Sequence, residues 1–228
     1  ILGSILDRNE AVFSGGAIHT LISDQPLASV HIDRCRFLAN RALRGAALTM
    51  MSGQVGVWNS AFTGNGSLTS HVVGGAVRCS EGNQSQQIGN CSFHGNLAHD
   101  GGAIRVDRGS PKITNSILFG NRSAVGTTWE VSIAAGASPE FRRCCVRGAS
   151  SLPGTANFDR DPRFLRPRGA DNVSGTLDDN LRLPHSLLGL SPCVDTGFNS
   201  LIAGAHLQVD LAGNRRVQRG NASSSGTI

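Results

Sequence analysis

Two carboxylates and an arginine lie within eight residues of one another, at Asp100, Arg105 and Asp107. The two aspartates flank a short alternating run that contains the arginine, so all three side chains are candidates for one outer face. A carboxylate pair can act as general acid and base, and an arginine can serve as the base. The preceding copy of this stretch keeps only the arginine, as Arg78. Catalysis by this cluster is therefore one hypothesis, and an ordinary solvated surface is the other.

A second group of polar residues lies in the loop of residues 169–180, where oxygen-bearing side chains surround two glycines. Calcium prefers several hard oxygen ligands on a flexible loop. The spacing differs from an EF-hand, and the loop has no glutamate. The candidate calcium ligands are Asp171, Asn172, Asp178 and Asp179. A solvated acidic turn without a metal is the alternative.

The elements that would position these groups are set by an internal repeat. Two short signatures, Phe-x-x-Asn and Gly-Gly-Ala-Ile, recur along the first two thirds of the chain. Alignment on the asparagine gives steps of 31, 25, 31 and 25 residues, and places Asn9, Asn40, Asn65, Asn96 and Asn121 in one column. Short runs with a period of two lie between the columns, and glycine, asparagine and serine separate them. The sequence therefore predicts an all-β solenoid of about five to six rungs, each rung being one turn of the chain.

Each column has a physical interpretation. Serine and cysteine, five residues before each asparagine, suit a tight interior corner, and the phenylalanine or leucine three residues before it suits a stacked core. The asparagines suit bends, because their side chains bond backbone groups and tolerate a left-handed conformation, and stacked amides can form a ladder. We therefore expect the asparagine column to be structural rather than catalytic.

The repeat defines two regions. Residues 1–149 are predicted to form the rungs, starting within a repeat, and the final copy loses its asparagine to Ala149. From residue 150 to 228 the period stops, and proline and aspartate become frequent. Because a solenoid needs a cover over its last apolar rung and its open strand edges, we expect this region to be an irregular C-terminal cap, apparently truncated at its end.

Composition restricts the possible functions. Among 228 residues, 39% are hydrophobic, only 5% are aromatic and 29 are glycine, which favours narrow stacked strands over a helical bundle. The net charge of +5 comes from scattered arginines without a nucleic-acid-binding motif, so no nucleic-acid partner is expected. No apolar run reaches the roughly 18 to 20 residues of a membrane helix, so a membrane-spanning segment is not expected.

The six cysteines do not have the spacing of a zinc site. Several occupy the small-residue column, which indicates burial rather than reactivity. Pairing of Cys145 with Cys193 is possible, but the sequence does not decide it.

The repeat signatures resemble those of right-handed parallel β-helix proteins of the pectate-lyase-like superfamily, and of the chlamydial polymorphic outer-membrane proteins. The C-terminal third is similar to bacterial β-helix proteins with a "choice-of-anchor Q" region, which carry four motifs in a fixed order. Here the motifs lie at residues 157–164, 181–183, 191–197 and 210–216. The resemblance implies a right-handed parallel β-helix that is secreted or displayed on the cell surface. By the same resemblance we expect the sequence to be truncated at Ile228, with any sorting or anchoring segment beyond that residue.

From the repeat and the resemblance we expect a non-enzymatic, extracellular or cell-surface protein that functions in display or adhesion. Its partner would be a polysaccharide or a cell-surface component, contacted through the outer face and the longest loops, at residues 20–27, 67–73 and 123–129. A polysaccharide lyase or glycoside hydrolase is the first alternative, and a structural spacer or sheath component is the second. The sequence leaves the oligomeric state and any cofactor other than calcium open.

Overall fold

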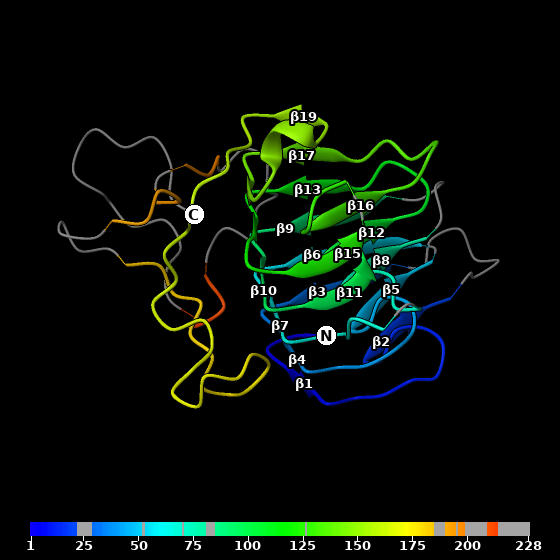
Figure 1. The fold of residues 1–228 in the computed structure, drawn as a ribbon, viewed down its shortest axis with the longest axis horizontal. Coiled ribbons are helices and arrows are strands. Elements are labelled where there is room, and N and C mark those ends of the chain that lie inside the picture. Colours follow the sequence, from blue (N-terminus) through cyan, green and yellow to red (C-terminus); the bar gives the residue numbers. More distant parts are fainter. Residues whose placement is uncertain are drawn as a thin grey trace.

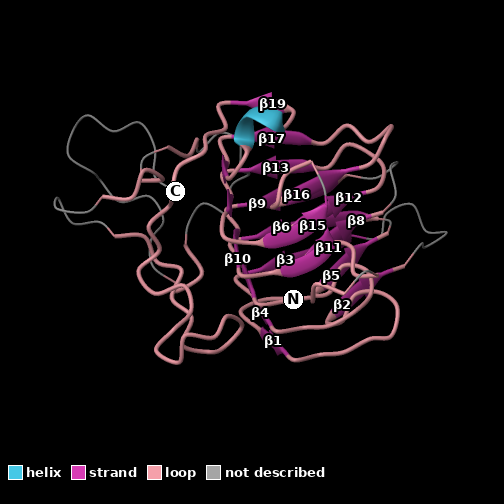
Figure 2. Cartoon of the chain, in the orientation of Figure 1, coloured by secondary structure: helices cyan, strands magenta, loops and turns pink. Residues whose placement is uncertain are grey.

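A computed structural model shows the chain wound into a parallel β-solenoid of about five turns, with almost no helix (Figures 1 and 2). It describes residues 1–21, 29–51, 53–69, 71–80, 85–125, 127–184, 190–194, 196–198 and 209–213. The predicted all-β solenoid is therefore confirmed. Most of the loop at residues 20–27 lies outside the described residues.

Three parallel sheets form the sides of the solenoid, and the chain visits them in the same order on each rung. Sheet 1 contains β2 (Ile18–Thr20), β5 (Leu48–Met50), β8 (Val77–Cys79), β12 (Ile104–Val106) and β16 (Val131–Ile133). Sheet 2 contains β3 (Ser29–Asp33), β6 (Gln54–Trp58), β9 (Gln86–Gly89), β13 (Lys112–Thr114), β17 (Glu140–Arg142) and β19 (Gly154–Thr155). Sheet 3 contains β1 (Ile5–Asp7), β4 (Arg36–Leu38), β7 (Ala61–Thr63), β10 (Ser92–His94), β14 (Ile117–Leu118) and β18 (Cys145–Val146). A separate pair, β11 (Leu97–Asp100) and β15 (Arg122–Val125), lies between sheets 3 and 1.

The stacking of like residues follows from the register of these strands. Phe37 of β4 pairs with Phe62 of β7, which pairs with Phe93 of β10. The first two rings are 4.4 Å apart and the next two 4.7 Å apart, nearly parallel, and all three are fully buried. Offset aromatic pairs at such distances add to the stabilisation from burial alone. The expected core of stacked phenylalanines is therefore present.

The small-residue column is an interior corner, as the sequence indicated. Its members Cys35, Ser60, Cys91 and Ser116 are buried. The Ser60 Oγ accepts the amide of Cys35 at 3.0 Å, and the Ser116 Oγ accepts the amide of Cys91 at 3.1 Å. Each serine Oγ also donates to a carbonyl two residues earlier in its own rung. The serines thus satisfy backbone groups that burial would otherwise leave unpaired.

The asparagine column forms a continuous ladder of hydrogen bonds. The Oδ1 of each asparagine from Asn40 to Asn121 accepts both the backbone N–H and the Nδ2 of the asparagine one rung earlier, at distances of 2.7 to 3.0 Å. Its own Nδ2 also donates to a carbonyl of the earlier rung. Asn40, Asn65 and Asn96 are completely buried, so the ladder pairs polar groups in the interior.

One detail of the ladder differs from expectation. The left-handed residue at each bend is the one before the asparagine: Arg8, Ala39, Gly64, Gly95 and Gly120. The ladder asparagines themselves are not left-handed. A second set of asparagines, Asn59, Asn90 and Asn115, takes the left-handed conformation at the corner between sheets 2 and 3.

The irregular cap expected for residues 150–228 stays a prediction, and its first residues lie at the end of the core. The end of the core is closed by the short 3-10 turn η1 (Ala149–Ser151), where the buried side chains of Ala149 and Leu152 join the main apolar cluster. The chain after β19, described at residues 156–184, 190–194, 196–198 and 209–213, runs along sheet 3 (Figure 1). We call this the flanking segment.

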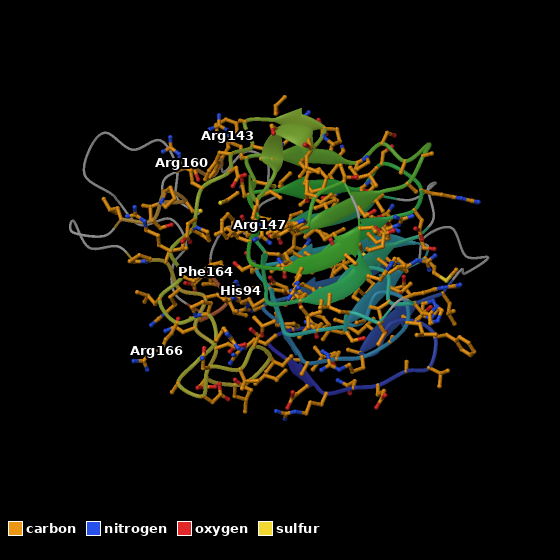
Figure 3. All side chains as sticks on the ribbon, in the orientation of Figure 1. His94, Arg143, Arg147, Arg160, Phe164 and Arg166 are labelled. Atoms are coloured by element: carbon orange, nitrogen blue, oxygen red, sulfur yellow. The ribbon has the colours of Figure 1, made fainter. Side chains whose placement is uncertain are left out.

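Contacts along several rungs hold the flanking segment against sheet 3. A guanidinium N–H of Arg36 donates to the carbonyl of Leu177 at 3.0 Å. The ring of Phe164 meets that of His94 edge-on, with 5.8 Å between centroids (Figure 3). Close to β14, the Nδ2 of Asn115 donates to the carbonyl of Phe198 at 3.2 Å. The segment therefore covers one long side of the rod, and sheet 3 is shielded where these contacts occur.

The ladder predicts a large stability difference between two otherwise similar substitutions. Asn96→Ala leaves the buried amide and Nδ2 of Asn65 without an acceptor, so we expect it to lower the free energy of unfolding by roughly 2 to 4 kcal/mol. Asn9→Ala, at the exposed first position, removes only the Nδ2 donor, while the backbone N–H still reaches the Oδ1 of Asn40, so it should cost less than about 1 kcal/mol. Denaturant unfolding of both variants tests this, and equal losses would contradict a ladder that stabilises the rod.

Candidate functional site

The structure brings Asp100, Arg105 and Asp107 together on the outer side of sheet 1. The Nε of Arg105 donates to Asp107 at 2.8 Å, one terminal nitrogen of Arg105 pairs with Asp100, and the same nitrogen donates to the Oγ of Ser132 at 2.7 Å. The other oxygen of Asp107 pairs with Arg78 of the preceding rung at 2.5 Å. We call these four charged residues the ionic cluster. Its side chains are only 15 to 21% exposed.

The pairing within the ionic cluster limits its chemistry. Both carboxylates are held by guanidinium groups, and two arginines balance two aspartates. A general base must be free to accept a proton from a substrate, and these hydrogen bonds compete with that role. The arrangement ties neighbouring rungs together through half-buried ion pairs. A catalytic role for Asp100, Arg105 and Asp107 stays a hypothesis, whereas their ion pairs have a structural role.

The carboxylates of the predicted calcium loop mostly bind the loop itself. Asp178 accepts the backbone N–H of Ala170 at 2.5 Å, and Asp179 accepts that of Gly175 at 2.6 Å. Asp171 accepts the backbone N–H of Val173 at 2.9 Å. The pKa of Asp178 is lowered by the hydrogen bonds that it accepts, chiefly from the Thr176 hydroxyl and then from the backbone N–H of Ala170. The aspartates thus close a tight turn.

This loop also docks on the rod. The backbone and side chain of Ser174 lie directly against the left-handed glycines Gly64 and Gly95, where a Cβ would clash at 2.4 Å. The absence of a side chain at those two bends therefore makes room for the loop. Within the described part of the chain, no three His, Cys, Asp or Glu side chains gather closely enough to hold a metal ion. Calcium binding by Asp171, Asn172, Asp178 and Asp179 stays a prediction.

A buried carboxylate that the sequence did not indicate ends the asparagine ladder. The side chain of Glu130, which is fully buried, accepts the backbone N–H of Gly120 and of Asn121, both at 3.1 Å, and the Nδ2 of Asn121 at 2.6 Å. It takes the position that the oxygen of the next asparagine would occupy. The final copy of the repeat has Ala149 at the aligned position, so the ladder continues through a residue from the preceding loop.

Glu130 sits in a charged and aromatic environment. A terminal nitrogen of Arg147 lies 3.1 Å from its Oε1, and the same nitrogen donates to the carbonyl of Asn121 at 2.6 Å. The guanidinium of Arg147 lies 4.5 Å from the ring centre of Trp129, which orients it by a cation–π contact. Burial raises the pKa of Glu130 to about 7, although the amide donors and Arg147 oppose that rise.

The sequence does contain a signal for Glu130. Strand pairing aligns Ile104 of β12 with Val131 of β16, so Glu130 follows Ala103 in the alanine column of the Gly-Gly-Ala-Ile signature. A charged residue in a column of small buried residues needs a partner inside the protein. The glutamate in this alanine column therefore marks position 130 as unusual, but the sequence does not show that Asn121 is the partner of Glu130.

A groove of about 980 Å³ lies between sheet 3 and the flanking segment. The rod contributes polar residues from its corner and its outer strand positions, and the flanking segment contributes both charged and apolar residues. Polar residues that line it are Arg36, Asn59, Ser60, Asn90, Ser92, Asn115, Asp179, Asn180, Arg182 and Asp210. Among the described contacts, the Ser92 hydroxyl and the Arg182 guanidinium form no hydrogen bond or ion pair. These two groups have unused hydrogen-bonding capacity at the groove.

Fold and geometry define a parallel β-solenoid with a polar groove along one side. Comparisons of the chain with protein-family models, with curated proteins and with solved structures found no match. The structure thus supports the solenoid repeat, while the resemblance to the pectate-lyase-like superfamily and to the choice-of-anchor region stays a prediction. None of the described helical turns is long and apolar enough to cross a membrane.

Glu130 predicts a specific pH dependence of stability. Between its unfolded pKa of 4.5 and its folded pKa of about 7, the folded state holds a proton that the unfolded state has released. Stability therefore falls as pH rises through this window, by up to about 3 kcal/mol. Glu130→Gln removes the titration, so its free energy of unfolding should fall less between pH 5 and pH 8. Glu140→Gln, at a half-exposed ion pair, is the control and should keep the wild-type slope. Parallel slopes in all three proteins would contradict the assignment.

To test calcium binding, calcium is titrated into the metal-free protein and the melting temperature is measured at each concentration. Binding by the loop predicts a rise in the wild type that is lost in Asp178→Asn. Asp159→Asn, which changes a carboxylate elsewhere in the flanking segment, should retain the rise. A flat titration in the wild type contradicts the calcium prediction.

Proposed function

We propose that this chain is a non-enzymatic β-solenoid scaffold, displayed on the cell surface or secreted, that binds a polysaccharide in the groove beside sheet 3. The observation that carries the proposal is the groove itself, which combines polar side chains from a rigid sheet with apolar residues such as Leu181 and Leu183. Binding sites typically combine apolar walls with a few placed polar groups on a preformed scaffold.

The chemistry of the groove suits a ligand rich in hydroxyl groups. Arg182 offers several N–H donors in a plane, and Ser92 offers a hydroxyl that can donate or accept. Asp179 and Asp210 add acceptors from the flanking segment. A sugar chain presents donors and acceptors along its length, and a groove that runs beside stacked rungs matches such an extended ligand. The location outside the cytoplasm rests on the resemblance of the C-terminal motifs.

The ionic cluster supports a binding function over a catalytic one. Its carboxylates are engaged by Arg78 and Arg105, so the best acid–base candidates of the sequence are already paired within the protein. A lyase or hydrolase remains the alternative, because Asp179 and Asp210 bring two carboxylates to one groove. Burial raises the pKa of Asp179, which is the direction that a general acid requires.

The test is a binding screen with neutral polysaccharides and polyuronates of defined length, by calorimetry and by co-sedimentation with insoluble glycans. We expect one class to bind, and Arg182→Ala and Ser92→Ala each to weaken its binding at least tenfold without a change in melting temperature. Arg168→Ala lies in the same segment outside the groove and should bind like the wild type. Absence of binding across the screen, or binding that neither groove variant affects, would overturn the proposal.

The same incubations separate binding from catalysis. Polymer length and newly formed chain ends are measured after prolonged contact with the protein. Intact polymer is expected for a binding scaffold. Cleavage that disappears in Asp179→Asn or Asp107→Asn would assign the enzymatic alternative instead.

A further inference from the structure

Two adjacent cysteines at the end of the rod have different surroundings. Cys144 and Cys145 point to opposite sides of the chain, as neighbouring residues of a strand do. Cys144 belongs to the main apolar cluster inside the solenoid, next to Val146 and Phe141. Cys145 belongs to a separate buried cluster on the outer side of sheet 3, together with Ile117 and Cys193.

The second cluster joins the rod to the flanking segment. Cys145 comes from β18, Ile117 from β14 and Cys193 from the flanking segment, and the two thiols lie in one buried cluster, close enough to interact. Phe158 and Phe164 pack around them, and neither cysteine is exposed to solvent. No disulfide joins them in the structure, where both are free thiols.

We infer that Cys145 and Cys193 form a disulfide that fixes the flanking segment to the last rung of the rod. The inference is independent of the groove and of its ligand. It is supported by the contact of the two thiols, by their shared apolar pocket and by the position of Cys145 outside the core. The remaining cysteines at positions 35, 79, 91 and 144 lie within the solenoid, where the backbone of neighbouring rungs surrounds them.

The reaction needs an oxidant, for which a small-molecule disulfide such as oxidised glutathione is sufficient. The thiolate of one cysteine attacks it, forms a mixed disulfide and releases one glutathione thiol. The second cysteine then attacks the mixed disulfide and releases the second glutathione, so two protein thiols are oxidised and one glutathione disulfide is reduced to two thiols. The hydrogen bond from Cys145 lowers the pKa of Cys193, which favours Cys193 as the attacking thiolate.

Burial determines when this reaction can occur. Both sulfur atoms are inaccessible in the folded chain, so the bond forms as the flanking segment docks during folding. The disulfide would close a loop of 48 residue steps, within which the described chain forms little regular structure. Closing such a loop restricts the unfolded chain and stabilises the docked arrangement.

The experiment refolds the full chain in a glutathione redox buffer and counts free thiols by alkylation after denaturation. We expect four alkylated cysteines of six in the oxidised protein, and six after reduction. Reduction should lower the melting temperature by at least about 5 °C. Six alkylated cysteines in folded protein from the oxidising buffer would overturn the inference.

Peptide mapping identifies the partners. Trypsin leaves Cys144 and Cys145 on one peptide, between Arg143 and Arg147, so the linked peptide alone does not distinguish them. Cys144→Ala should keep the link to the peptide that contains Cys193, and Cys145→Ala should lose it. A link retained in Cys145→Ala would overturn the assignment. If Cys145→Ala fails to fold, Cys193→Ala provides the same test from the flanking side.

Discussion

The polarity of the asparagine ladder is the constraint on which the rod depends. Each side-chain amide from Asn9 to Asn96 donates to the asparagine of the next rung, and each from Asn40 to Asn121 accepts from the previous one, so the chain of hydrogen bonds has a direction. Such a chain leaves two donors at its last member, and in a buried position these need an acceptor. Above its pKa of about 7, the ionised carboxylate of Glu130 has acceptor capacity at both oxygens and no hydrogen-bond donor. Glu130 therefore ends the ladder better than a further asparagine, whose own amide group would again require a partner.

This use of side chains limits which groups are left for the proposed ligand. The side chains of the repeated residues already have partners within the rod: the asparagines form the ladder, the serines accept backbone N–H groups, and the phenylalanines stack. The charged residues of sheet 1 are likewise paired, with Arg105 bridging two aspartates. The hydroxyl of Ser92 and the guanidinium of Arg182, which form no described hydrogen bond, lie where the repeat meets the flanking segment. The groove at that boundary combines a side of stacked strands with a side of non-repeating chain, as binding sites on regular scaffolds commonly do.

The sequence predicts the repeating part of this structure well, because each rung repeats the same local requirement. The phenylalanine stack, the buried corner of serine and cysteine and the asparagine ladder all follow from columns of like residues. The rest depends on contacts that no period encodes. Arg36 meets Leu177 across 141 positions, and neither residue belongs to a motif that would indicate the other. The sequence does not place Glu130 at the end of the ladder for a similar reason. The repeat alignment has Ala149 at the position of the next asparagine, whereas the actual acceptor comes from the loop before β16. The acidic loop was recognised as a unit, but its docking on Gly64 and Gly95 depends on the shape of the rod.

The short strand β18 connects the ladder end with the flanking segment. Arg147, directly after the strand, pairs with Glu130 and holds the carbonyl of Asn121. Cys145, within the strand, contacts Cys193 of the flanking segment and also donates to the carbonyl of Arg160 at 3.0 Å. Displacement of β18 would therefore disturb both the acceptor of the ladder and the packing of the segment that forms one wall of the groove. The end of the repeat is thus a structural junction, at which the charge that completes the rod and the contacts that place the non-repeating chain belong to neighbouring residues.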